Sequence, residues 1–120
     1  MSSTARHAAW LRGRRAEALA RLWLRMKGYR ILAQDLRTPV GEIDLVVRRG
    51  RVVAFVEVKY RGAHEQALAS ISDRQRRRIE RAAEFFLARN PGCADALLRF
   101  DGLLLAPGRL PRHLPDLWRP

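Results

Sequence analysis

The sequence predicts one α/β domain whose elements follow in the order α-β-β-β-α-β. The chain has 120 residues, of which 48% are apolar, which is enough to bury one core. Two segments repeat apolar residues at the three- and four-residue steps of a helix, and short segments between and after them have strand-like patterns. No internal repeat or long linker divides the chain, so residues 1–120 form a single domain.

The first helix is predicted at residues 8–27. Its apolar stripe would consist of Ala16, Leu19, Ala20, Trp23 and Met26. Gly28 follows as a natural helix stop. A short strand of mixed polarity is expected at residues 29–37, followed by a turn at residues 38–41.

A β-hairpin is predicted next, with strands at residues 41–47 and 52–60. The connection is Arg48-Arg49-Gly50-Arg51, in which the glycine can supply a positive φ. Residues 62–71 are expected to form a loop or a partly helical segment.

The second helix is predicted to begin at Ser72, with Gln75 three residues later in the pattern of a capping box. Asn90-Pro91-Gly92 would end it. Its buried stripe would contain Ile79, Ala82, Ala83, Phe86 and Leu87. Residues 96–105 are almost continuously apolar, which is typical of a strand covered on both faces. The last fifteen residues, from Ala106, hold four prolines and are expected to wrap the surface as a Pro-rich tail.

Charge is the strongest compositional signal. Twenty-four Lys and Arg oppose twelve Asp and Glu, so the formal net charge is +12. This excess favours a polyanionic partner, above all nucleic acid; a solvated basic surface in an arginine-rich proteome is the alternative. The basic residues are twenty-two arginines and two lysines. Lys27 lies at the end of a predicted helix, where the helix dipole favours a cation. Lys59 lies in a predicted strand, where a function that requires a compact ammonium could explain why it is lysine and not arginine.

Cysteine content and hydropathy limit the cellular compartments in which the protein is expected. Cys93 is the only cysteine, so an internal disulfide is excluded and a reducing compartment fits. No apolar run approaches the roughly 20 residues of a membrane span, so no membrane partner is expected. The Arg-rich N-terminus resembles an organelle transit peptide, but its helical periodicity favours a structural helix and a cytoplasmic protein.

Strand alternation brings acidic residues together on the hairpin. In residues 52–60 the even positions are apolar, so Glu57 and Lys59 share the opposite face. In the preceding strand Ile43, Leu45 and Val47 share one face, and Glu42 and Asp44 the other. If both apolar faces point the same way, all four charged residues share one surface. Depending on the loop, Asp44 lies opposite Glu57 or diagonal to it, with Cβ atoms about 4.5–5.5 or 7–8 Å apart.

Two carboxylates at either spacing can hold a divalent cation. Hard oxygen ligands completed by water suit Mg²⁺ or Mn²⁺. Such an ion polarises phosphate and lowers the pKa of bound water, and Lys59 could orient that water or stabilise transition-state charge. The alternative is a half-solvated hairpin with a charged outer face. Gly41-Glu42-Ile43-Asp44 followed, after twelve residues, by Glu57-Val58-Lys59 is more specific than a lone Glu-x-Lys.

These two motifs, Gly41 to Asp44 and Phe55 to Arg61, resemble those of the PD-(D/E)xK, or restriction-endonuclease-like, nuclease superfamily. Within it the chain is similar to the YraN-type family of small bacterial proteins, relatives of archaeal Holliday-junction resolvases. The likeness extends over nearly the whole chain. It implies a central mixed sheet flanked by helices, with Asp44, Glu57 and the Val58 carbonyl as metal ligands. It also implies Lys59 as the catalytic lysine and Glu17 as an auxiliary acid. Without the resemblance, an exposed surface glutamate is an equally good interpretation of Glu17.

Other residues could contact the partner. The candidates for phosphate contact are Arg61 and the helical cluster Arg74, Arg77, Arg78 and Arg81, although a solvated helix face explains the cluster nearly as well. His64 could act as a base, but a lone loop histidine is more often neither base nor ligand. Asp101 lies in an apolar strand and needs a partner if it is buried, for which Arg99 is preferred.

The function predicted is a metal-dependent endonuclease that hydrolyses phosphodiester bonds in DNA, using one or two Mg²⁺ (or Mn²⁺). Branched DNA as the substrate follows from the resemblance alone. One rival is a nucleic-acid-binding protein of the same fold that cleaves nothing. A second is a basic RNA- or ribosome-associated module whose carboxylates are structural. A homodimer is left open.

Overall fold

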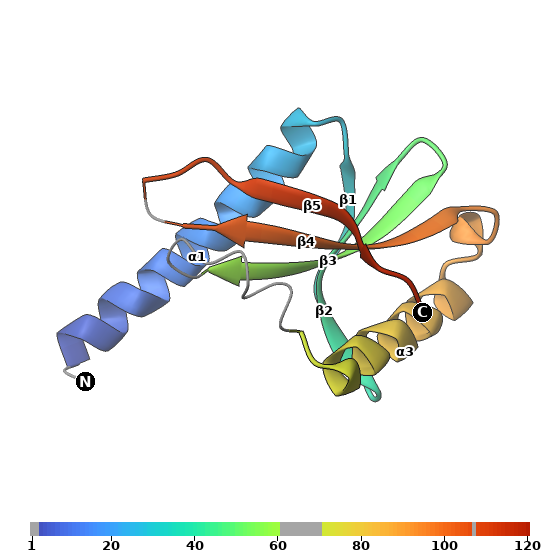
Figure 1. The fold of residues 1–120 in the computed structure, drawn as a ribbon, viewed down its shortest axis with the longest axis horizontal. Helices are drawn as coiled ribbons and strands as arrows, with labels where there is room; N and C mark the ends of the chain where they lie inside the picture. The colour runs from blue at the N-terminus through green and yellow to red at the C-terminus, as the bar shows by residue number, and fades with distance from the viewer. Residues whose placement is uncertain (1–2, 61–70, 107) are drawn as a thin grey trace.

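The computed structural model describes residues 3–60, 71–106 and 108–120, with side chains from residue 13 onward apart from that of Tyr60. The element order is α-β-β-β-α-β-β, so the predicted order is confirmed and one strand is added at the C-terminus (Figure 1). The elements are α1 (Ser3–Met26), β1 (Arg30–Thr38), β2 (Gly41–Arg49), β3 (Val52–Tyr60), α3 (Asp73–Arg89), the short 3₁₀ helix η1 (Pro91–Cys93), β4 (Leu97–Leu105) and β5 (Arg112–Trp118).

The strands form one mixed sheet in the order β1-β2-β3-β4-β5. β3 and β4 are parallel, and the other neighbouring pairs are antiparallel. The β2–β3 hairpin closes at Gly50, whose φ of 60° is favourable for glycine, as predicted. The connection from β3 to β4 passes through α3, as expected for parallel neighbours.

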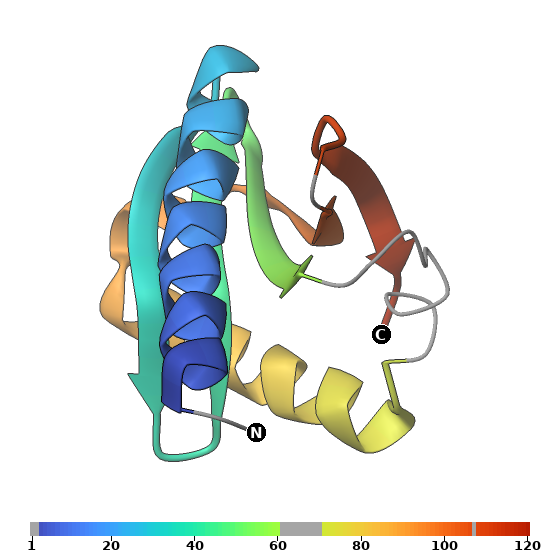
Figure 2. The ribbon, with the colours of Figure 1, turned by 90° about the vertical axis from the view of Figure 1, so that its left-hand side faces the viewer.

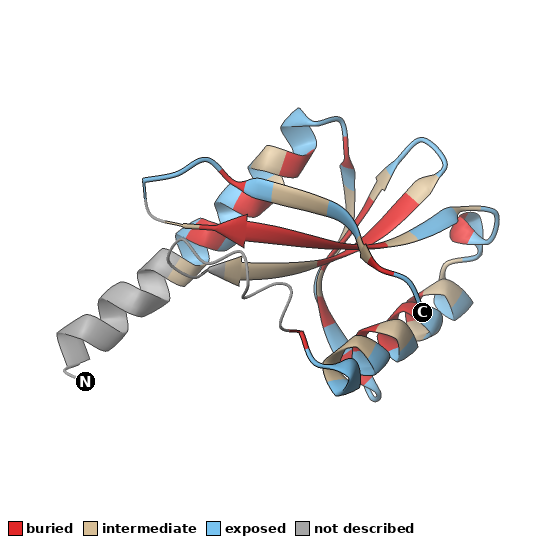
Figure 3. Cartoon of the chain, in the orientation of Figure 1, coloured by how far each residue is buried: buried red, intermediate tan, exposed pale blue. Residues whose placement is uncertain are grey.

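Helices α1 and α3 cover opposite faces of the sheet (Figures 1 and 2). Alternate residues of β3 belong to the two cores, because Phe55 packs on the α3 side and Val56 on the α1 side. Both side chains are fully buried, and the central strands contain most of the buried residues (Figure 3). A domain with a central sheet flanked by helices is therefore present, compatible with a restriction-endonuclease-like fold.

The buried stripe of α1 differs in part from the prediction. Ala16 and Ala20 are buried as expected, but Leu24 completes the stripe at a further four-residue step. Leu19 is 41% exposed and Met26 is 72% exposed, so both were wrongly placed in the core. The two alanines allow close contact between helix and sheet, and this contact fixes a rotation of α1 that turns both longer side chains outward.

The predicted start and stripe of α3 are confirmed. The Ser72 hydroxyl accepts a hydrogen bond from the Gln75 backbone N–H at 3.1 Å. Ile79, Ala82, Ala83 and Phe86 are buried. The Gln75 side chain does not complete a capping box with Ser72 but extends toward β3, where it contributes to the site described below.

The C-terminal segment joins the sheet, so a tail that only wraps the surface was a wrong expectation for it. β5 pairs with β4, and Trp118 is buried against Phe100 with ring centroids 5.0 Å apart. Pro115 lies within β5, and this is tolerated because the outer side of an edge strand needs no ladder hydrogen bond.

Candidate functional site

The regular pairing of β2 is interrupted at Asp44. Its ladder with β3 ends at Leu45, which pairs with Val56. Ile43 packs in the α3 core although Leu45 packs in the α1 core, so the predicted common face of Ile43, Leu45 and Val47 is wrong at Ile43. On the other side, Asp35 of β1 has a φ of 49°, and no pair with Asp44 forms between the pairs Gln34–Leu45 and Leu36–Ile43. β2 therefore separates from β3 at Asp44.

The Asp44 carboxylate occupies the place where the β2–β3 ladder stops. Its Oδ2 accepts a hydrogen bond from the Val58 backbone N–H at 2.7 Å. Burial raises the pKa of Asp44, and the charges of Asp35 and Glu17 add to this; the Val58 N–H and the Lys59 ammonium act in the opposite direction. The carboxylate is thus held in position by one donor but is incompletely neutralised.

Glu57 lies beside Asp44 on the α3 side of the sheet. Its Oε1 accepts a hydrogen bond from Gln75 Nε2 at 3.3 Å and lies 3.3 Å from Lys59 Nζ. Burial first, and then the charge of Asp44, raise the pKa of Glu57 to about 7. The two carboxyl groups are close enough to interact strongly, so in the absence of a cation the pair tends to retain a proton near neutral pH.

Both carboxylates line a pocket of about 680 Å³ between β2, β3 and α3. Arg74 and Arg78 of α3 line the same pocket, together with Glu42, Ser72, Gln75 and Ile79. β2 can approach α3 here because residue 41 is glycine: a Cβ at Gly41 would lie only 2.4 Å from the Arg78 carbonyl oxygen. The first residue of the Gly-Glu-Ile-Asp motif therefore brings the carboxylates close to the arginines.

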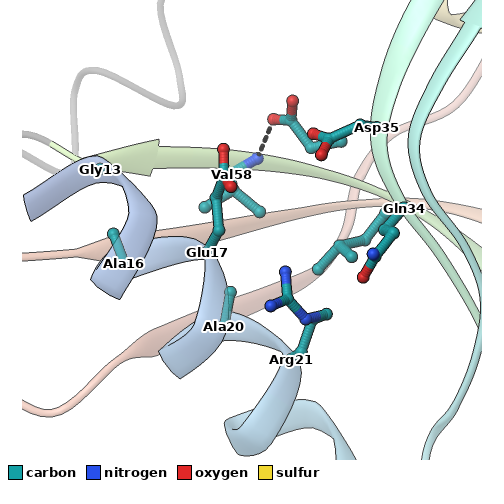
Figure 4. Close-up of a pocket in the computed structure, with 10 residues that line it drawn as sticks. Gly13, Ala16, Glu17, Ala20, Arg21, Gln34, Asp35 and Val58 are labelled. Carbon is teal, nitrogen blue, oxygen red and sulfur yellow. Dashed lines mark hydrogen bonds between the residues drawn. The ribbon is translucent and has the colours of Figure 1, made fainter. Parts of the chain in front are cut away.

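Asp44 also lines a smaller pocket of about 160 Å³ on the α1 side. Glu17 of α1 and Asp35 point into this region beside Val58, whose N–H donates to the Asp44 carboxylate (Figure 4). Arg21 and Gln34 line it as well. Glu17 is exposed, yet it is close enough to raise the pKa of Asp44. The structure thus brings Glu17 to the candidate site, on the α1 side of Asp44.

The other predicted residues fall into three groups. Lys59 lies beside Glu57, and Val58 contacts Asp44 through its N–H. Arg77 and Arg81 are exposed on α3 but do not line the carboxylate pocket. Arg61 and His64 lie outside the described residues. Within the described ranges, no group of three or more His, Cys, Asp or Glu side chains could hold a metal ion, so the acidic centre is the pair Asp44 and Glu57.

Two residues of the site were not found from the sequence. Gln75 matched a capping pattern, and nothing in the sequence indicates that its side chain reaches Glu57 instead. Asp35 lies in an edge strand of mixed polarity, and only its left-handed backbone, which Asp tolerates better than most residues, brings it to the gap beside Asp44. The position of Asp35 beside Asp44 depends on the register between β1 and β2, which the sequence does not determine.

Asp101 belongs to a different cluster, on the α1 side of the sheet. It is fully buried and accepts hydrogen bonds from Arg99 Nε and Nη2, both at 2.8 Å, so the predicted pairing with Arg99 is confirmed. His113 Nε2 lies 2.7 Å away, and the Asp116 backbone N–H donates at 2.9 Å. Burial alone would raise the pKa of Asp101, but these hydrogen bonds outweigh it and lower the pKa.

Comparison with known proteins places the sequence of this chain in a family. Residues 16–105 match the model of the uncharacterised protein family UPF0102, a span that includes Glu17, Asp44, Glu57 and Lys59. A UPF0102 protein of Paramagnetospirillum magneticum is 57% identical over 121 residues, covering 98% of this chain and 94% of the relative. A UPF0102 protein of Parvibaculum lavamentivorans is 58% identical over 113 residues, covering 94% of this chain and 85% of the relative.

A third relative, from Caulobacter vibrioides, is 55% identical over 106 residues, covering 88% of this chain and 85% of the relative. The names of these relatives state the family and no reaction or partner. In the part of the chain that the structure describes, no helix combines the length and apolarity needed to cross a membrane. The match over most of the chain shows that this protein belongs to the UPF0102 family.

Proposed function

We propose that this protein is a divalent-metal-dependent endonuclease that hydrolyses phosphodiester bonds in DNA. The observation that carries the proposal is the convergence of Asp44 and Glu57 on one pocket, with Lys59 beside Glu57 and two arginines of α3 on the rim. Acidic groups for a cation, an ammonium and phosphate-binding guanidinium groups are the components that metal-assisted phosphodiester hydrolysis needs.

The donor set fits Mg²⁺ or Mn²⁺. Mg²⁺ is commonly bound by one or two carboxylates and keeps several waters, which suits a centre whose acidic side chains are Asp44 and Glu57. Burial, and after it the charge of Asp44, raise the pKa of Glu57, and a bound cation would relieve the repulsion between the two carboxylates. The Val58 N–H faces Asp44, and since the N–H and C=O of one strand residue point to the same side, its carbonyl is a suitable further ligand.

When bound, the cation supplies Lewis-acid chemistry, by polarising a phosphoryl oxygen and lowering the pKa of a coordinated water. Asp44 and Glu57 hold it. Lys59 contributes positive charge next to the reacting phosphate and stabilises the charge that develops on its oxygens. Arg74 and Arg78 bind flanking phosphates and orient the strand. Glu17 acts as an auxiliary acid from the α1 side, a role that rests on the resemblance to the PD-(D/E)xK superfamily.

The resemblance to resolvase relatives favours branched DNA as the substrate. The main rival is a protein that binds nucleic acid through the same arginines and cleaves nothing. A basic RNA- or ribosome-associated module with structural carboxylates is the other. Both rivals predict that the wild-type protein shows no metal-dependent DNA cleavage, and this distinguishes them from the enzyme.

The decisive experiment is a cleavage assay on branched, flapped and single-stranded DNA with Mg²⁺ or Mn²⁺. The wild-type protein should cleave at least one of these substrates, and Glu57→Gln should reduce cleavage to background while retaining the fold. Glu42→Gln is the matched control, because Glu42 lines the same pocket but is exposed on β2. Metal-free DNA binding should survive in both variants. Binding without cleavage by the wild-type protein on every substrate would favour the binding-protein alternative.

A further inference from the structure

A second pocket at the far end of α3 gathers three arginines. It has a volume of about 310 Å³, and Arg30 of β1, Arg48 of β2 and Arg89 of α3 contribute to its lining. The other described residues that line it are Leu32, Phe86, Asn90, Pro91, Gly92 and Cys93. No aspartate or glutamate occurs among these described lining residues, so positive charge collects here without a carboxylate to neutralise it.

Neutral groups hold two of these arginines in place. Arg48 Nε donates to the Gly50 carbonyl and Nη1 to the Gly92 carbonyl, both at 3.0 Å. The Arg89 guanidinium lies over the Phe85 ring, 3.6 Å from its centroid. Carbonyl and aromatic partners fix the positions of the guanidinium groups but do not cancel their charge, so both arginines are preorganised for an anion.

The pairing of Arg30 with Arg48 is expected to destabilise the sheet. Arg30 and Arg48 are direct partners in the antiparallel β1–β2 ladder, and like charges opposite each other are destabilising. The helix dipole favours a cation at the C-terminal end of α3, which accounts for Arg89. The backbone carbonyls of Gly50 and Gly92 account for Arg48, but neither effect accounts for Arg30 directly opposite it, whereas an anion bound between the two arginines would.

A line of side chains on α3 connects this pocket with the carboxylates. Arg74, Arg78, Arg81, Phe85 and Arg89 follow at steps of three or four residues, so they lie along one side of the helix. All four of these arginines are exposed. Arg74 and Arg78 line the carboxylate pocket, and Arg89 lines the second pocket. At 1.5 Å per residue the two ends are about 20 Å apart, which corresponds to roughly six base steps of duplex DNA.

We propose that the Arg30–Arg48–Arg89 pocket binds a backbone phosphate of the DNA whose scissile bond lies at Asp44 and Glu57, and so anchors it about six base steps away. The guanidinium fork matches the geometry of phosphate oxygens. This inference rests on the proposed function for its ligand, DNA, but does not require that the protein cleave it. A polynucleotide phosphate and free inorganic phosphate share this chemistry, and the test separates them.

The experiment measures DNA affinity by fluorescence anisotropy in EDTA over a range of salt concentrations. The pocket variant is Arg30→Gln with Arg89→Gln, because both residues are exposed while Arg48 supports the backbone. The matched control is Arg15→Gln with Arg25→Gln, which removes the same charge from exposed positions of α1 on the other face of the sheet. For a 20-nucleotide duplex, the slope of log Kd against log salt should fall by about two in the pocket variant and stay at the wild-type value in the control.

Two further arms identify the ligand. With a four-nucleotide oligomer, too short to reach both pockets at once, the pocket variant should lose less affinity relative to the wild-type protein than it does with the long duplex. Equal slopes of pocket variant and control on the long duplex would overturn the proposal. If inorganic phosphate at constant ionic strength raises the Tm of the wild-type protein but not of the pocket variant, while the DNA slope is unchanged, the pocket takes free phosphate and the DNA assignment is wrong. Because no metal is present, none of these results depends on cleavage.

Discussion

Asp101, which is fully buried, and Glu57, which is partly buried, lie one step apart in the β3–β4 register, because Asp101 pairs with Val56, yet their environments are opposite. Asp101 faces the α1 side and its pKa is lowered, although it is completely buried. Glu57 faces the α3 side and its pKa is raised to about 7. Depth in the sheet therefore does not explain the difference between the two carboxylates.

The number and kind of partners explain it. Asp101 has two hydrogen bonds from Arg99, one with His113 and one from the Asp116 backbone. Among the described residues, Glu57 has Gln75 and Lys59 on a single oxygen and faces the like charge of Asp44. A carboxylate whose lone pairs are saturated by protein donors is suited to holding the fold, while one left short of positive charge is suited to binding a cation.

Each centre also contains one of the two lysines of the chain. Lys27 Nζ lies 2.5 Å from His113 Nδ1, and donation there leaves the His113 Nε2–H to donate to Asp101. Burial, followed by the charge of Arg49, lowers the pKa of Lys27. Lys59 instead contacts its carboxylate directly, at 3.3 Å from Glu57 Oε1. Lys27 thus acts through a histidine, whereas Lys59 pairs with Glu57, which lines the carboxylate pocket.

The largest expected effect is the loss of the saturated carboxylate. Asp101→Asn should lower the free energy of unfolding by about 3–5 kcal/mol, because it removes one partner of a buried ion pair and leaves Arg99 uncompensated. Urea denaturation followed by circular dichroism measures the change. Asp116→Asn is the matched control, since this carboxylate pairs with Arg119 at the surface and should have little effect. An Asp101→Asn protein as stable as the control would contradict the structural role.

The unsaturated carboxylate should behave in the opposite way in metal-free protein. Because the pKa of Glu57 is raised in the folded state, the protein gains stability from protonated Glu57 below about pH 4.5 and loses it as the pH rises to about 7. The loss should be on the order of 2–3 kcal/mol, and Glu57→Gln should lack it. Unfolding at pH 5 and pH 8 in EDTA tests this.

Adding Mn²⁺ at pH 8 provides the control for this pH effect. It should restore stability to the wild-type protein and not to Glu57→Gln, since a ligand that binds only the folded state stabilises it by mass action. For Asp101 the sign is reversed: its lowered pKa contributes stability above its unfolded pKa, which is lost as the pH falls through the folded value. If wild type and Glu57→Gln lose stability equally between pH 5 and pH 8, the contrast between the two centres does not hold.

Local patterns predicted much of this fold because they depend on residues close in sequence. The β3 strand was placed at residues 52–60, and the start of α3 followed from Ser72 and its cap. Tertiary packing decided what the sequence did not reveal. Leu24 replaced Leu19 and Met26 in the core of α1, and the proline-containing C-terminus became β5 because an edge strand was available on β4.

The candidate site was predictable in its acidic pair and less so in its surroundings. The alternation of side chains along the strand placed Glu57 and Lys59 on one face. The carboxylates of Asp44 and Glu57 line one pocket. Alternation failed at Ile43, because β2 leaves β3 at Asp44 and the strand no longer presents regular faces. The contribution of Gln75 and the position of Asp35 depend on how α3 and β1 pack against this irregular point, and no pattern within either segment encodes that packing.

Lys59 provides the smallest expected effect on stability and the sharpest test of its role. Its ion pair with Glu57 is partly exposed, so Lys59→Ala should change the free energy of unfolding by less than about 1 kcal/mol. Metal-dependent DNA cleavage should nevertheless fall sharply, since the ammonium is proposed to stabilise charge on the reacting phosphate.

Lys59→Arg should not restore cleavage, because a planar guanidinium cannot replace a compact ammonium beside Glu57. Lys27→Arg serves as the matched control at the other centre: Lys27 lies by His113, outside the carboxylate pocket, so cleavage should remain at the wild-type rate. Cleavage rates at saturating Mn²⁺, with metal binding measured in parallel, separate a lost reaction step from a lost metal. Full activity in Lys59→Arg would mean that any cation suffices at this position, and Lys59 would then only balance the charge of Glu57.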